Sequence, residues 1–159
     1  MIILNVRILV YWYSSQHCTV RWHTAYSSYF SIGNGTRQGG VLSPYLFTRY
    51  IRELINTVAK MNIGCKIAGQ MVNIVAHGDD IVLLAASWRA LQLLQLTTLV
   101  AQAHATDLYC NTDKTVAMVF PPKNRRLVIG NNFPLFRLGH EVIKYVSSFK
   151  YLGHVIMLR

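Results

Sequence analysis

Two adjacent carboxylates, Asp79 and Asp80, are the residues of this sequence best suited to hold a metal ion. They lie in a short polar turn between two apolar runs, residues 72–76 and 81–86. The chain has only six acidic residues among 159 and a formal net charge of +10. Neighbouring carboxylates repel each other unless a cation neutralises them, and oxygen ligands suit Mg²⁺. The pair is therefore a candidate site for a divalent cation.

A turn without a metal is the alternative interpretation of this pair. Aspartate favours turns and protects exposed strand ends, so a hairpin turn alone could explain both residues. The flanking runs are short and rich in Ile, Val and Leu, which predicts two buried strands. At the turn between such strands, both carboxylates can approach one point. The sequence by itself leaves both interpretations open.

A glycine-rich loop followed by an amphipathic helix lies upstream of the acidic pair. Residues 33–40 contain four glycines, and Ser43 and Pro44 follow them. Serine is a favoured N-cap and proline a favoured first helical residue, so we expect a helix to begin here. One face of this helix is apolar: Leu46, Phe47, Tyr50, Ile51, Leu54, Ile55, Val58 and Ala59.

The remaining pattern alternates short helices and strands. Residues 1–13 predict a buried helix, residues 18–22 and 26–32 a strand pair, and residues 65–86 a hairpin unit that contains the acidic pair. Ser87 is a candidate N-cap for a helix that ends near residue 105. Four short strands are expected after Thr115: residues 116–120, 126–129, 141–146 and 151–156.

The length and the charge of the chain indicate how many domains it has and what kind of partner it favours. The length suits one domain, and 52% hydrophobic residues suffice for a core. From Lys114 onward, eight lysines and arginines face a single acid, Glu141. Such a balance favours a polyanion such as nucleic acid, although a solvated basic surface explains it equally well.

The cysteines and the first residues bear on the compartment. Cys18, Cys65 and Cys110 are far apart and odd in number, which favours a reducing intracellular location, nucleus or cytoplasm, over secretion. The opening apolar segment is interrupted by Asn5 and Arg7. We therefore expect a core helix instead of a signal peptide or a membrane span, and no membrane partner.

Four segments together resemble the reverse transcriptase of non-LTR (LINE-type) retrotransposons. These segments, in the order typical of that family, are residues 36–44 (TRQGGVLSP), 77–85 (HGDDIVLLA), 108–115 (LYCNTDKT) and 149–153 (FKYLG). The resemblance extends from about residue 10 to the end of the chain. Each motif alone is weak, but four in order make the resemblance specific.

The resemblance implies an α+β fold. We expect a partial polymerase palm, in which an antiparallel sheet is backed by helices and followed by short β-hairpins. Residues 1–120 would form the partial palm. Residues 121–159 would form distal palm strands that include a hairpin similar to the primer grip.

The resemblance also implies RNA-templated DNA synthesis by nucleotidyl transfer. The expected partners are an RNA template, a DNA primer and a dNTP, and the expected cofactor is Mg²⁺, with Mn²⁺ as an alternative. Asp79 and Asp80 would be catalytic metal ligands, and Lys114 a catalytic residue near the triphosphate. Arg37, Gln38 and Gly39 would bind nucleotide and template. The residues expected at the primer are His77, Gly78, Phe149, Tyr151, Leu152 and Gly153.

Several of these residues also have plain structural interpretations. Lys114 could be an ordinary lysine at a strand end, and His77 a structural strand histidine. Where the family usually has an aromatic residue followed by Ala, this chain has His77 and Gly78. Asp107 stands where the family favours Gly at a helix end, which predicts a less favourable C-cap.

One departure bears on activity. The family uses a third metal carboxylate upstream of the glycine-rich loop, whereas this chain has no Asp or Glu before Glu53. We therefore expect an N-terminally truncated domain without fingers, first metal-Asp motif or thumb, and inactive alone because electrostatic preorganisation is lost. A complementary fragment would have to supply the missing palm strand.

Two further possibilities stay open beside an inert palm fragment. The chain could be a basic nucleic-acid-binding remnant of a retroelement that performs no chemistry. It could also fail to fold stably, because lost strands would leave a sheet edge and an apolar face uncovered.

Overall fold

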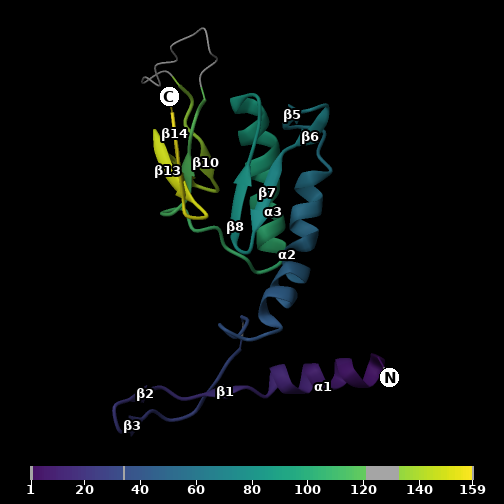
Figure 1. Ribbon diagram of the computed structural model, residues 1–159, viewed down its shortest axis with the longest axis vertical. Helices are drawn as coiled ribbons and strands as arrows, with labels where there is room; N and C mark the ends of the chain where they lie inside the picture. The colour runs from purple at the N-terminus through teal and green to yellow at the C-terminus, as the bar shows by residue number, and fades with distance from the viewer. Residues whose placement is uncertain (1, 34, 121–132, 159) are drawn as a thin grey trace. The chain divides into compact units, whose positions relative to one another are not determined.

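The computed structural model describes residues 2–33, 35–120 and 133–158 (Figure 1). The chain divides into two compact units, Met1–Phe47 and Thr48–Arg159. The division falls inside one helix, α2 (Ser43–Ala59). The described elements mix helices with small, mainly antiparallel sheets, which is compatible with the expected α+β class.

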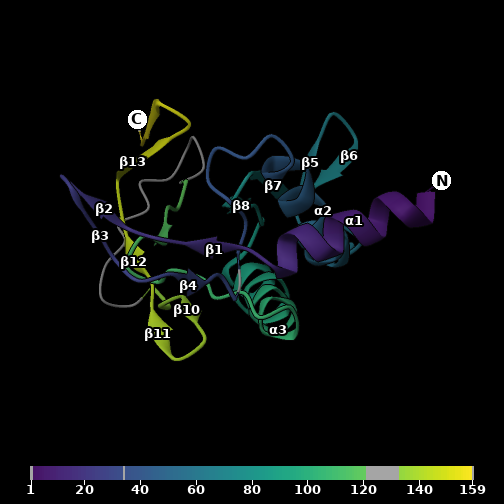
Figure 2. The same cartoon turned by 90° about the horizontal axis from the view of Figure 1, so that it is seen from below.

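The first unit consists of a helix and a long hairpin. Figures 1 and 2 show that the hairpin extends away from the helix, in line with it. The elements are α1 (Ile2–Ser14), β1 (His17–Cys18), β2 (Arg21–Trp22), β3 (Ala25–Tyr26) and β4 (Phe30–Ser31). β1 pairs with β4 and β2 with β3, both antiparallel, which confirms the predicted strand pair.

A serine bridges the gap between the two halves of this hairpin. The backbone N–H of Ser27 donates to the carbonyl of Val20 (2.9 Å), and the backbone N–H of Val20 donates to the hydroxyl of Ser27 (2.9 Å). The Thr19 hydroxyl also donates to the Ser27 carbonyl (2.9 Å). These bonds keep the strands in register where regular ladder pairing is interrupted.

The first helix is exposed. Residues 2–14 are helical as expected, but α1 side chains such as Leu4 (62% exposed) and Val10 (62%) remain open to solvent. The expectation of a buried helix is therefore wrong for the described side chains. Among the residues that the structure describes, no helix has the length and apolar character needed to span a membrane.

The second unit begins within α2 and continues through two hairpins to a π-helical turn and α3. These elements are β5 (Cys65–Ile67), β6 (Gln70–Val72), β7 (Ile74–His77), β8 (Asp80–Leu83), the π-helix (Ala90–Leu96) and α3 (Thr97–Ala105). Six short strands follow: β9 (Val116–Ala117), β10 (Arg137–Leu138), β11 (Glu141–Val142), β12 (Lys144–Tyr145), β13 (Ser148–Tyr151) and β14 (His154–Met157).

All sheets in the described part of the chain are two-stranded. Six of the seven are antiparallel pairs, and β9 with β12 is parallel. Two predicted strands are wrong. Within residues 151–156, Leu152 (φ +47°) and Gly153 (φ +85°) form the turn between β13 and β14. Residues 141–146 form two strands, since β11 pairs with β10 and β12 with β9. The predicted strand at residues 126–129 lies outside the described residues.

Two clusters of buried side chains form the core of the second unit. The first contains Leu54, Val58, Leu99 and Ala103, from α2 and α3. The second joins the π-helix to the C-terminal strands through Leu96, Ala117, Phe136, Leu138 and Ile143. Leu83 and Cys110 contact both clusters, and burial raises the pKa of the Cys110 thiol.

The two predicted serine caps have different outcomes. Ser87 is confirmed, since its hydroxyl accepts the backbone N–H of Ala90 (3.2 Å) at the start of the helix. The N-cap role of Ser43 is wrong. The Ser43 hydroxyl donates to the carbonyl of Arg37 (2.5 Å), and Leu42 provides the first helical acceptor, to Leu46 N–H (2.9 Å).

The end of α3 bears out the strain expected at Asp107. Asp107 adopts a left-handed conformation (φ +51°). Its N–H donates to the carbonyl of His104 (3.2 Å), and Leu108 N–H donates to that of Ala103 (2.8 Å). This is a Schellman motif, which favours glycine at the left-handed position.

We expect Asp107→Gly to raise the free energy of unfolding by up to about 1 kcal/mol, because glycine removes the steric cost of the left-handed conformation. Asp107→Ala should lower it, since alanine lacks the polar side chain that tolerates this region. Urea unfolding of both variants checks this. Equal stability of the two variants would contradict the conformational account.

Candidate active site

The acidic pair lies at the tip of the β7–β8 hairpin. His77 and Asp80 are the last paired residues, so Gly78 and Asp79 form a two-residue turn. Gly78 has a positive φ of +59°, whereas Asp79 does not, which is the pattern of a type II′ turn with glycine first. The Gly78 of this sequence thus fixes the tight turn that carries both acids.

The two faces of this hairpin have different surroundings. Residues paired across the strands share a face, and the faces alternate along each strand. One face carries Ile74, Ile81 and Leu83, which pack against the α2–α3 cluster. The pairs Val75–Val82 and His77–Asp80 share the other face, and Val75 is 43% exposed. Asp80 therefore projects on the side away from the helices.

A buried asparagine connects the hairpin to α2. The side-chain amide of Asn73, which is only 4% exposed, donates to the carbonyls of Val58 (2.8 Å) and Met61 (3.0 Å). The first carbonyl belongs to the last turn of α2 and also accepts the N–H of Met61 (3.1 Å), and the second lies just beyond the helix. The carbonyl of Asn73 also accepts the N–H of Leu84 (2.9 Å). Asn73 thus holds both strands of the hairpin at the end of the helix.

The donor set fits a hard divalent cation only in part. The carboxylates of Asp79 and Asp80 are exposed, and neither has a hydrogen bond or an ion pair within the described residues. Carboxylate oxygens are suitable Mg²⁺ ligands. However, the described part of the chain contains no group of three or more His, Cys, Asp or Glu that could hold a metal. The two acids can therefore supply part of a ligand set.

The glycine-rich loop forms a tight turn at the start of α2. Gly40 N–H donates to the carbonyl of Arg37 (3.0 Å), and Gly39 has a φ of +78°, as in a type II turn. A Cβ on Gly40 would lie 2.7 Å from the Ser43 hydroxyl and 3.1 Å from the Arg37 carbonyl oxygen, so a larger residue would displace the Ser43 side chain. The side chains of Arg37 and Gln38 are exposed on this loop.

Lys114 lies in a turn that leads into β9. The side-chain oxygen of Asn111 accepts the N–H of Lys114 (3.1 Å), and the Thr115 hydroxyl donates to the Asn111 carbonyl (2.6 Å). The lysine side chain is exposed. Within the described residues, no hydrogen bond or ion pair joins it to Asp79 or Asp80.

The predicted primer hairpin is formed by β13 and β14. Phe149 pairs with Ile156, and Tyr151 with His154, so these residues share one face. The hydroxyl of Tyr151 is buried without a hydrogen-bond partner among the described residues. Lys150 and its partner Val155 lie on the opposite, exposed face.

The structure brings together only part of the predicted site. His77, Gly78, Asp79 and Asp80 share the tip of one hairpin. Arg37, Gln38 and Gly39 share one turn, but that turn belongs to the first unit and the hairpin to the second. The roles of all these residues in metal, nucleotide and primer binding stay predictions.

Sequence reasoning missed Asn73, although a signal was present. Asn73 is the one polar residue inside the apolar run of residues 72–76. A buried polar side chain must find hydrogen-bond partners, and two carbonyls near the end of a helix meet that need. Gly64 is the second missed residue, because a Cβ there would lie 2.6 Å from the Asn73 Cβ.

Comparisons with known proteins identify similar sequences. A family model described as "Reverse transcriptase (RNA-dependent DNA polymerase)" matches residues 4–156. A curated relative, "Retrovirus-related Pol polyprotein from type-2 retrotransposable element R2DM" of Drosophila melanogaster, is 32% identical over 130 residues. The alignment covers 80% of this chain and 12% of that polyprotein, so the chain spans about an eighth of the relative's length.

We expect Asn73→Ala to lower the free energy of unfolding by about 1–3 kcal/mol, since it removes the hydrogen bonds of a buried amide to the carbonyls of Val58 and Met61. Asn62→Ala is the matched control, because Asn62 is exposed and nearby. It should change the stability by less than about 0.5 kcal/mol. Urea unfolding measures both, and equal effects would contradict the role of Asn73.

Proposed function

We propose, from the premise that this chain belongs to the reverse transcriptase family of non-LTR retrotransposons, that Asp79 and Asp80 are metal ligands of a polymerase palm. In this proposal residues 1–120 form a partial palm. Residues 121–159 form distal palm strands, including the primer-side hairpin. The substrates are an RNA template, a DNA primer and a dNTP.

One observation carries the proposal: the two acids lie at the exposed tip of the β7–β8 hairpin, and one face of that hairpin packs against α2 and α3. Ile74, Ile81 and Leu83 fix the hairpin against α2 and α3, while the acids stay uncovered. A rigid support with exposed carboxylates suits a site where a cation and a triphosphate must enter from solution. Divalent cations bound there would lower the pKa of a primer 3′-hydroxyl and neutralise charge on the phosphoryl group.

Other residues have positioning roles in this proposal. The exposed side chains of Arg37 and Gln38 bind the incoming nucleotide and template base, and Gly39 lets the backbone approach them. Lys114 lies near the triphosphate and can donate a proton to the leaving pyrophosphate. The primer end contacts His77 and Gly78. The hairpin residues proposed at the primer are Phe149, Tyr151, Leu152 and Gly153.

Asp79 and Asp80 are too few to complete a two-metal site by themselves. The described residues provide no third ligand beside them, and no acid precedes Glu53 in the sequence. Positioned charge is commonly the largest catalytic contribution, so this chain made alone is inactive in our proposal. A carboxylate from a complementary polypeptide would complete the set.

We expect no nucleotide incorporation when the purified chain alone is given an RNA template, an annealed DNA primer, dNTPs and Mg²⁺ or Mn²⁺. The physical reason is the incomplete ligand set. Primer extension resolved on a gel measures this. Incorporation that Asp79→Ala abolishes would contradict the inactivity and support the metal site. Incorporation that survives Asp79→Ala and Asp80→Ala would contradict the assignment of both residues.

A second candidate function is nucleic-acid binding without chemistry. Two observations favour it: the net charge of +10 and the absence of a three-ligand metal group in the described part of the chain. Basic side chains that neutralise phosphates release counterions, so binding of this kind weakens with salt and depends little on sequence.

If this second function holds, we expect the chain to bind single-stranded RNA with an affinity that falls as the salt concentration rises. Asp79→Ala should leave this affinity unchanged or raise it slightly, because the acids repel phosphate. Fluorescence anisotropy of a labelled oligonucleotide over a salt series measures this. Lack of binding at low salt would exclude this second function. An Mg²⁺-dependent affinity that Asp79→Ala removes would favour the metal-binding palm instead.

A further inference from the structure

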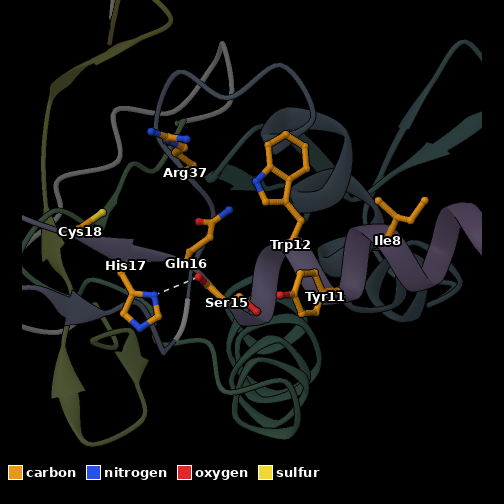
Figure 3. Close-up of a pocket in the computed structure, with 8 residues that line it drawn as sticks. All are labelled: Ile8, Tyr11, Trp12, Ser15, Gln16, His17, Cys18 and Arg37. Atoms are coloured by element: carbon orange, nitrogen blue, oxygen red, sulfur yellow. Dashed lines mark hydrogen bonds between the residues drawn. The ribbon is translucent and has the colours of Figure 1, made fainter.

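A cavity in the first unit contains side chains suited to a nucleotide. It has a volume of about 560 Å³ and is bordered by the end of α1, by β1 and by the glycine-rich loop. That volume lies within the usual range for small-molecule sites. Figure 3 shows the lining residues: Ile8, Tyr11, Trp12, Ser15, Gln16, His17, Cys18 and Arg37.

Three side chains of this lining are suited to bind a nucleotide. Figure 3 shows Trp12, Gln16 and Arg37 around the same space, while the ring of His17 turns aside and donates from Nδ1 to the Ser15 carbonyl (3.0 Å). Trp12 is 57% exposed, so a face of its indole is open to a ligand. An aromatic plane, an amide and a guanidinium are the groups that stack a base, bond its edge and pair with phosphate.

The backbone around these side chains is fixed. The backbone of Arg37 is fixed because its carbonyl accepts the Gly40 N–H and the Ser43 hydroxyl. These bonds do not use the guanidinium, which can therefore contact a ligand. The carbonyl of Gln16 accepts the N–H of Ile32 (3.1 Å), which ties it to the returning strand. Rigid supports of this kind reduce the entropy lost when a ligand binds.

The local charge favours an anion. Residues 1–47 contain Arg7, Arg21 and Arg37 and no Asp or Glu. No carboxylate of this unit therefore competes for the Arg37 guanidinium or repels a phosphate. A single stacked base gives weak binding, and a phosphate paired with Arg37 strengthens it.

We propose that this cavity holds one unstacked base and the adjacent phosphate of a single-stranded nucleic acid, with Trp12 as the stacking platform and Arg37 as the phosphate partner. The inference rests on the proposed function only for the class of ligand. The subsite itself does not depend on Asp79, Asp80 or a metal.

The test uses the full chain, a short unstructured oligouridine and tryptophan fluorescence. Trp12→Phe should abolish most of the quenching on binding, and Trp22→Phe should leave it intact. Trp22 is the matched control because it is 74% exposed on β2 and outside the cavity. Trp12→Ala should weaken binding about 5- to 100-fold, whereas Trp22→Ala should not. Circular dichroism verifies that each variant keeps its helix content.

A salt series isolates the phosphate contact. Arg37→Gln should reduce the slope of log affinity against log salt by about 0.7, the value for one phosphate on a single strand. Arg7→Gln, outside the cavity, should leave the slope unchanged. Equal slopes for Arg37→Gln and Arg7→Gln would mean diffuse binding and overturn the proposal.

The remaining outcomes separate the two proposals. If uridine triphosphate quenches Trp12 as strongly as the strand at equal nucleotide concentration, the cavity takes a free nucleotide and the strand assignment is wrong. If the strand binds but Trp12→Ala changes nothing, the cavity is not a subsite and the proposed function still stands.

If Trp12 is quenched while primer extension survives Asp79→Ala and Asp80→Ala, the subsite stands and the metal assignment fails. Absence of any binding at low salt overturns the subsite.

Discussion

The hydrogen bonds of the buried Asn73 amide are the interaction on which the position of the acidic pair depends. Two donors from one side chain meet two carbonyls near the end of α2. The residue's own carbonyl accepts Leu84 N–H after β8, so one position connects the helix with both strands. Removing the amide would take one donor from each of these carbonyls, and the Val58 carbonyl would keep the N–H of Met61 (3.1 Å). Apolar packing of Ile74, Ile81 and Leu83 then fixes which hairpin face meets the helices.

Electrostatics explains why the acids stand where they do. Burying two adjacent carboxylates without a partner is costly, so the structure leaves them in water at a turn. The rest of the chain is strongly basic, with sixteen Lys and Arg against six acids. The acidic tip therefore carries two of the six negative charges of a basic chain. A cation that neutralised the tip would remove the repulsion between the two adjacent carboxylates.

The sequence correctly predicted those elements whose stability depends on residues close together in the chain. The buried part of the α2 face (Ile51, Leu54 and Val58), the hairpin around Asp79 and Asp80, the Ser87 cap and the left-handed conformation of Asp107 all follow from neighbours within a few residues. Tyr50 and Ala59 of the predicted α2 face are exposed. The wrong predictions concern features that residues farther away in the chain decide. Ser43 donates to Arg37 six residues away instead of capping its own helix, and α1 is exposed despite its apolar composition. The turn at Leu152 and Gly153 was hidden in a run that reads as one strand.

The candidate site was only partly visible in the sequence. The Asp79–Asp80 pair is conspicuous because acids are scarce, but Asn73 resembles a surface residue until its partners in α2 are known. The cavity beside Trp12 was equally hidden, because it combines α1, β1 and Arg37 from segments some twenty residues apart. Membership of the reverse transcriptase family rests on the match over residues 4–156, not on any single residue.

Paramagnetic broadening by Mn²⁺ in a two-dimensional amide NMR spectrum tests the central claim most directly. We predict that the first signals to vanish, at substoichiometric Mn²⁺, are those of Gly78, Asp79, Asp80 and their neighbours in β7 and β8. The Asp79→Asn, Asp80→Asn double variant should lose this broadening. Broadening centred elsewhere, or unchanged in that variant, would contradict a metal site at the hairpin tip.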